Sequence, residues 1–160
     1  MLSAVQAMHL LRELLEIDET VRRRRVALTF VQKQRRMTIA SELGRWAMAS
    51  RPSPKGAELR QHPRAEMKVR LELLGGPKPI TLETDTLGLG GAGVAVSFPV
   101  RRGDLWRMRL CPPGEEPVEL GAEVVWVDVP RARAGLRFVQ QTDELRALVE
   151  RLVFSELIRK

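Results

Sequence analysis

The spacing of hydrophobic residues changes once along this 160-residue chain and changes back near its end. Up to residue 49, apolar residues recur every three or four positions, which is the period of an α-helix. From Met67 to Phe138 they alternate with polar residues, which is the period of a half-buried β-strand. A helical stripe returns after Asp143. This order predicts a helical segment followed by a β domain that one helix closes.

The N-terminal helical stretch has a defined start, and two courses fit its middle. Ser3 followed by Gln6 is typical of a capping box, in which each side chain satisfies a backbone amide at the helix start. Residues 22–25 are four consecutive arginines, which cover every face of one helical turn. Because such a turn cannot be buried all round, one long helix and two helices broken at this turn both fit the pattern.

Leu14, Val21 and Leu28 lie seven residues apart in this stretch and form a heptad-like stripe, which Arg24 interrupts. A stripe of this kind on a helix without a domain of its own favours pairing between chains. We therefore expect a homo-oligomer that forms through the N-terminal helix. Packing of the stripe against the chain's own barrel is the alternative.

Six runs of alternating residues follow a linker. Prolines stiffen residues 51–58 and exclude helix there. In the fifth run, Trp126 takes the apolar side of the alternation together with Val124. Short strands joined by Gly/Pro turns predict an antiparallel barrel, and Asp143 is placed to cap the closing helix. The runs cover residues 67–73, 80–84, 94–96, 105–110, 118–126 and 136–138.

We therefore expect a mainly β fold with helices, built on a six-stranded antiparallel β-barrel with a C-terminal helix. The helical segment takes residues 1–50, the linker 51–58, and the barrel with its helix 59–160. A chain of this length is enough for one well-buried domain plus an appendage.

Charge is concentrated at the N-terminal end. The net charge of the whole chain is +7, and residues 1–51 hold +5 of it, from ten Lys/Arg against five Asp/Glu. A basic patch of this kind attracts nucleic acid, anionic lipid or an acidic partner, and a solvated helix face is the plainer interpretation. Residues 22–36 hold seven bases and no acid: Arg22, Arg23, Arg24, Arg25, Lys33, Arg35 and Arg36.

Residue types needed for catalysis or metal binding are sparse. The chain has one cysteine, Cys111, and two histidines, His9 and His62, in different regions, so we expect no metal site, no cofactor and no enzyme activity. No apolar run approaches the ~20 residues of a membrane span, and the start lacks the pattern of a signal peptide. We expect a cytoplasmic protein without a membrane span.

Several segments, taken in order, resemble the PilZ domain family over roughly residues 58–155. Arg60 and Arg64 form an Arg-x-x-x-Arg pair just before the first barrel strand. Residues 86–94 are similar to the family's second motif, (Asp/Asn)-x-Ser-x-x-Gly, between its second and third strands. Residues 124–127 and 134–138 are similar to its last two strands.

This resemblance implies a receptor for the bacterial second messenger cyclic di-GMP. The ligand-binding residues that it implies are Arg60, Arg64, Asp85, Thr86, Gly88, Gly90 and Gly91. The chain departs from the second motif: in one register Thr86 replaces Asp/Asn and Gly88 replaces Ser, and a shift by one residue restores Asp85 but puts Leu87 at the Ser position. Either way the serine hydroxyl is lost.

Three functions remain open at this point. The first is a non-catalytic cyclic di-GMP receptor that relays its signal through an unidentified protein partner. The second is a degenerate PilZ scaffold that binds only proteins, such as motility or pilus machinery. The third is nucleic-acid or anionic-surface binding through the basic patch, with a steep salt dependence.

Overall fold

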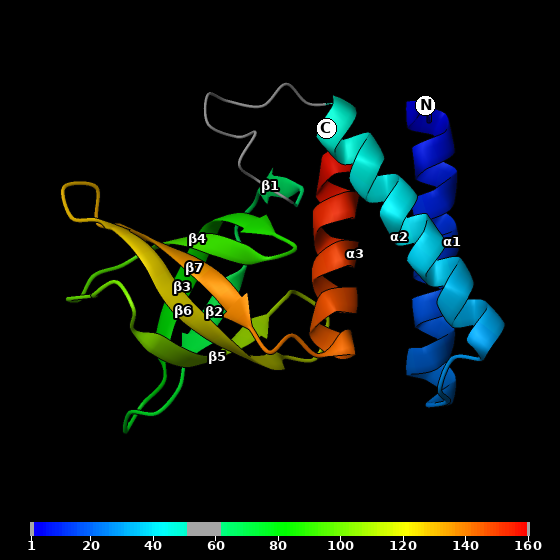
Figure 1. Ribbon diagram of the computed structural model, residues 1–160. Coiled ribbons are helices and arrows are strands. Elements are labelled where there is room, and N and C mark those ends of the chain that lie inside the picture. The colour runs from blue at the N-terminus through cyan, green and yellow to red at the C-terminus, as the bar shows by residue number, and fades with distance from the viewer. Residues whose placement is uncertain (1, 51–61, 160) are drawn as a thin grey trace. The chain divides into compact units, whose positions relative to one another are not determined.

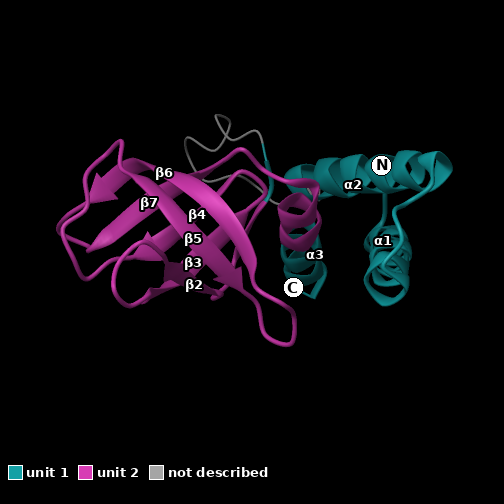
Figure 2. Ribbon diagram, turned by 90° about the horizontal axis from the view of Figure 1, so that it is seen from below, with its two compact units in different colours: residues 1–63, 150–160 teal, residues 64–149 magenta. Residues whose placement is uncertain are grey.

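A computed structural model describes residues 2–50 and 62–159 of the chain (Figure 1). The predicted linker at 51–58 lies outside the described residues, so the predicted domain bounds stay a prediction. The described chain groups into two compact units, coloured separately in Figure 2. The helical unit is Met1–Pro63 with Glu150–Lys160, and the barrel unit is Arg64–Val149.

Two helices form the N-terminal part of the helical unit: α1 (Ala4–Arg24) and α2 (Phe30–Ser50). The predicted capping box at Ser3 and Gln6 is confirmed, with both reciprocal hydrogen bonds present. Helix α1 ends at Arg25, which takes a left-handed conformation with φ 51° and ψ 37°. A second capping box, between Thr29 and Gln32, starts α2. Of the two courses that fitted the sequence, the structure therefore has two helices broken at the arginine run.

The buried face of α1 includes Leu11 and Leu14, and the buried face of α2 includes Ile39 and Leu43. Leu14 is fully buried within the chain itself, whereas Val21 and Leu28 are half-buried. The first member of the heptad-like stripe is thus covered within the chain, which leaves packing of the stripe against the barrel a prediction as well. Self-association stays a prediction.

A closed barrel of six antiparallel strands makes up most of the barrel unit (Figure 1). Hydrogen-bonded neighbours run in the order β3-β2-β5-β6-β7-β4, and pairing of β4 with β3 closes the ring. Among the described residues there is one extra strand, β1, which pairs with β3 outside the ring. The bounds are β1 (Arg64–Glu66), β2 (Arg70–Leu73), β3 (Ile80–Gly88), β4 (Gly91–Ala95), β5 (Leu105–Cys111), β6 (Val118–Asp128) and β7 (Arg133–Val139).

The first predicted strand begins later than its alternation indicated. Met67 and Val69 lie before β2, and the buried hydroxyl of Thr84 replaces one backbone hydrogen bond of each. It donates to the carbonyl of Met67 at 2.8 Å and accepts the amide of Val69 at 2.8 Å. One threonine side chain of β3 thus holds the segment between β1 and β2, together with two backbone hydrogen bonds to the same strand.

Helix α3 (Asp143–Arg159) follows the barrel and begins one residue earlier than predicted. Thr142, not Asp143, is its cap: the Thr142 hydroxyl accepts the amide of Leu145 at 3.1 Å. Asp143 instead lies in the first turn, where a negative charge suits the helix dipole. Of the helices described, none is both long and apolar enough to cross a membrane.

Candidate ligand-binding site

A bulge in β3 brings together the two residues that the sequence offered as alternatives. The register of β3 against β4 shifts between Thr84 and Thr86, which leaves Asp85 as the extra residue. Both neighbouring side chains consequently reach Gly93: a Cβ there would lie 2.7 Å from Asp85 Oδ1 and 2.7 Å from Thr86 Oγ1. The Gly93 amide also donates to the Thr86 hydroxyl at 3.2 Å. The Asp85 carboxylate and the Thr86 hydroxyl therefore lie side by side over Gly93.

Arg133 joins Asp85 to an indole ring. Its Nε lies 2.6 Å from Asp85 Oδ2, and its guanidinium carbon lies 5.7 Å from the centre of the Trp126 ring. Asp85 Oδ1 is buried and accepts no hydrogen bond from any described residue. Arg133 and Asp85 remain about one-third exposed, so solvent screens their attraction.

Trp126 contradicts the expectation that it faces inward with Val124. A second bulge, between Val124 and Trp126 in β6, turns the indole to the outside of the barrel, where it is 40% exposed. There it covers a bare strand, since a Cβ on Gly135 would lie 2.0 Å from Trp126 Nε1. The alternating pattern placed Trp126 on the inner side of the strand. The sequence Val-Val-Trp gives no indication of a bulge, so the outward position of Trp126 could not be predicted.

One row of paired residues connects these groups across five strands. The Cα partners are Glu66 with Thr86, Thr86 with Gly93, Gly93 with Gly135, and Gly135 with Trp126. The two glycines at its centre carry no side chains of their own, and the side chains of Asp85, Thr86 and Trp126 fill the space over them. The row runs along the outer face of the barrel, and we call it the glycine row.

The remaining residues of the predicted site lie beside the glycine row. Arg64 is exposed on β1 and pairs with Gly88 of β3. The Gly90 carbonyl accepts the amide of Phe138 at 2.9 Å. A Cβ on Gly91 would lie 2.0 Å from the carbonyl oxygen of Leu136, so Gly91 is required by the closure of the barrel. Arg60 lies outside the described residues.

Most of the described basic patch is occupied by intramolecular contacts. Arg22 and Arg23 both bind Glu19, and Arg35 binds Glu13 through two hydrogen bonds of 2.7 and 2.8 Å. The Arg35 hydrogen bond lowers the pKa of Glu13. Arg24, Arg25 and Lys33 are exposed. Nucleic-acid binding stays a prediction. Fewer cations than the sequence suggested are exposed to bind phosphate groups.

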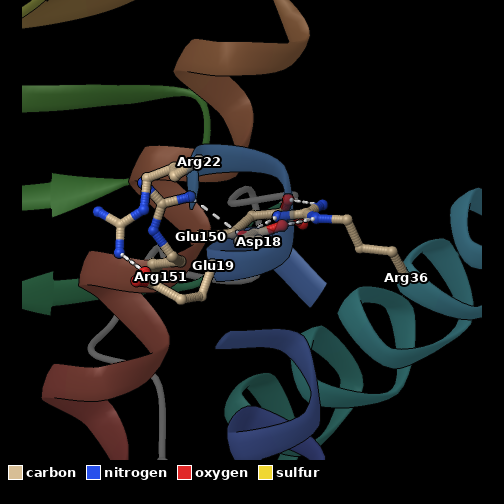
Figure 3. Close-up of polar contacts among 6 residues, drawn as sticks. All are labelled: Asp18, Glu19, Arg22, Arg36, Glu150 and Arg151. Carbon is tan, nitrogen blue, oxygen red and sulfur yellow. Dashed lines mark hydrogen bonds and ion pairs between the residues drawn. The ribbon is translucent and has the colours of Figure 1, made fainter. Parts of the chain in front are cut away.

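Arg36 is mostly buried, with 13% of its side chain exposed, and it takes part in a cluster of ion pairs (Figure 3). It binds Asp18 at 2.7 and 3.1 Å and Glu150 at 2.8 Å, and Arg151 binds Asp18 at 3.0 Å. We call these four residues the buried ion network; it links α1, α2 and the middle of α3. Burial alone would lower the pKa of Arg36, but the hydrogen bonds to Asp18 and Glu150 outweigh it and raise that pKa, so the guanidinium stays charged.

Solved structures similar to this chain include two proteins that it matches over about half of their own length. The Bacillus subtilis inhibitor of motility MotI/DgrA is 15% identical with a TM-score of 0.55, over 64% of this chain and 52% of that chain. Escherichia coli YcgR, solved in complex with c-di-GMP, is 14% identical with a TM-score of 0.51, over 61% and 45%. A tetrameric PilZ protein from Xanthomonas campestris is 21% identical with a TM-score of 0.40, over 97% and 77%.

These identities are low, so the structural likeness shows the fold alone. Comparison with the curated proteins gives no match. The sequence model described as PilZ domain matches residues 58–155, which is more than half of the chain. The match spans the closed barrel, its extra strand and most of α3, and confirms the resemblance seen in the motifs. The chain belongs to the PilZ domain family.

Proposed function

We propose that this chain is a non-catalytic, cytoplasmic signalling protein that binds cyclic di-GMP and relays the signal through contacts with another protein. The observation that carries the proposal is the convergence of a carboxylate, a hydroxyl and an indole along the glycine row, beside an exposed arginine on β1. The E. coli relative was solved with this dinucleotide, which supports the choice of ligand.

Each group on this face suits one part of a purine dinucleotide. The Arg64 guanidinium can donate two parallel hydrogen bonds to a phosphate or to the guanine O6/N7 edge. The Trp126 indole offers an apolar face on which a base can stack. Asp85 Oδ1, which lacks a donor among the described residues, would accept a guanine N–H once Arg133 moves aside.

Two contacts favour a second function, that of a PilZ scaffold which binds only proteins. Arg133 already holds Asp85, and the Gly93 amide already holds the Thr86 hydroxyl. A ligand has to compete with both contacts, and Gly88 stands where the family motif has its serine hydroxyl. Each lost hydrogen bond to a ligand costs about 1–3 kcal/mol.

Calorimetric titration with cyclic di-GMP separates the two functions. For the wild-type protein we expect saturable binding. Arg64→Ala is expected to weaken it by roughly tenfold to a hundredfold, because one charge-assisted partner is removed. Arg70→Ala is the matched control: Arg70 is another exposed arginine of the same unit, 61% exposed on β2, and its loss should change affinity less than about twofold.

A gain-of-binding variant covers the case in which the wild type does not bind. Gly88→Ser combined with Thr86→Asp restores the hydroxyl and the acceptor of the family motif. Binding by this variant alone would show that the face is built for the dinucleotide but has lost affinity. Absence of binding in both proteins supports the scaffold function, and wild-type binding unaffected by Arg64→Ala would place the ligand elsewhere.

A further inference from the structure

Three large apolar side chains stand exposed within six residues where α1 passes into α2. Val26 is 50% exposed, Phe30 75% and Val31 74%. A single exposed apolar residue is ordinary, but a cluster on one short segment marks an interaction surface. We call residues 24–33 the connector tip.

The same segment carries three exposed cations: Arg24, Arg25 and Lys33. No acidic residue occurs between positions 22 and 36, so no neighbouring carboxylate in the sequence offsets them. The surface that complements the tip must therefore be negatively charged and must also offer an apolar layer.

Part of the backbone of the tip is already hydrogen-bonded within the chain. The Thr29 hydroxyl accepts the Gln32 amide at 3.2 Å, and the Gln32 side chain accepts the Thr29 amide at 2.9 Å. Two amides at the start of α2 are thereby satisfied within the chain. Unsatisfied amides would resist transfer out of water, so satisfying these two lowers the cost of moving the start of α2 toward an apolar layer.

We propose that the connector tip docks on an anionic lipid bilayer, with Phe30 and Val31 in the interfacial layer and the three cations at the headgroups. Clusters of basic residues bind anionic lipid electrostatically, and apolar side chains add affinity by entering the acyl boundary. Nucleic acid fits the cations equally well, but its backbone gives Phe30 and Val31 no hydrocarbon to enter. The proposal rests on the helical unit alone and is independent of nucleotide binding.

The test is co-sedimentation of the full chain, without nucleotide, with vesicles of phosphatidylglycerol and phosphatidylcholine or of phosphatidylcholine alone. We expect binding to the anionic vesicles only. Phe30→Ser with Val31→Ser should lower the vesicle affinity at least about tenfold through lost apolar burial. Arg24→Gln with Lys33→Gln should lower it roughly 25-fold, from about fivefold for each cation.

Met37→Ser is the matched control, since Met37 is 62% exposed on the same helix but lies beyond the tip. Its affinity should stay within about twofold of the wild type. Thermal unfolding of each variant checks that the fold is kept, which we expect because every substituted side chain is exposed. The proposal is overturned if the wild type ignores anionic vesicles, or if the Phe30/Val31 variant binds them as the wild type does. Binding to a DNA duplex without binding to vesicles also overturns it and assigns the tip to nucleic acid.

Discussion

Substitution of Arg36 by methionine tests whether the buried ion network holds the helical unit together. The guanidinium makes three hydrogen bonds to Asp18 and Glu150, whose side chains are each only 7% exposed. Removing one partner of a buried ion pair typically costs 3–5 kcal/mol, because the remaining charge is left without compensation. Arg151 still binds Asp18, so we expect the low end of this range, a loss of about 3 kcal/mol.

Arg35→Met provides a control at the preceding position of the same helix. Arg35 makes an equally well-formed pair with Glu13, but both side chains are more than 40% exposed. Exposed pairs contribute about 0–1 kcal/mol, so the two variants should differ by roughly 2 kcal/mol although the substitution is identical. Urea denaturation followed by circular dichroism at 222 nm measures both free energies of unfolding.

Two further measurements test the buried ion network. The double variant with Arg36→Met and Glu150→Gln should recover part of the loss, about 1–2 kcal/mol, because the orphaned carboxylate is neutralised. Since the pKa of Arg36 is raised, its contribution is present at every pH below the unfolded pKa of arginine, and the loss should be constant between about pH 6 and 9. Equal free energies of unfolding for the two single variants would refute the role of burial in this network.

The remaining predictions concern the Arg35 pair and two glycines. Because the hydrogen bond to Arg35 lowers the pKa of Glu13, this pair stabilises the fold above the unfolded pKa of Glu13 and stops doing so as the pH falls through the folded pKa. The small cost of Arg35→Met at pH 7 should therefore diminish as the pH is lowered through the folded pKa of Glu13, as measured by urea titrations; a cost that grows on acidification would contradict this. Gly91→Ala should destabilise by about 1–3 kcal/mol, because its Cβ would meet the Leu136 carbonyl oxygen at 2.0 Å. Gly44→Ala, where a Cβ meets nothing within 4 Å inside α2, should stabilise by about 0.5–1 kcal/mol, and thermal unfolding that shifts both variants the same way would count against this steric account.

Local physical chemistry predicted most elements of this fold, although it missed β1. The change of hydrophobic period separated helices from strands. Four arginines in one turn, which cannot be buried all round, marked a possible break, but one long helix fitted the sequence as well. The Ser3 capping box was equally readable, since all its partners lie within one turn of sequence. The short alternating runs joined by Gly/Pro turns then predicted the antiparallel barrel, which the structure confirms.

Only the tertiary structure decided which side chains meet. The bulges beside Asp85 and Trp126 shift the facing of a strand by one residue, and alternation alone cannot reveal a shift that pairing with a neighbouring strand imposes. Arg36 looked like one more member of a basic patch, yet it binds Glu150, which is 114 positions away along the chain. Burial of a charge depends on which elements pack together, so a contact between segments this distant cannot be read from the spacing of residues along the chain.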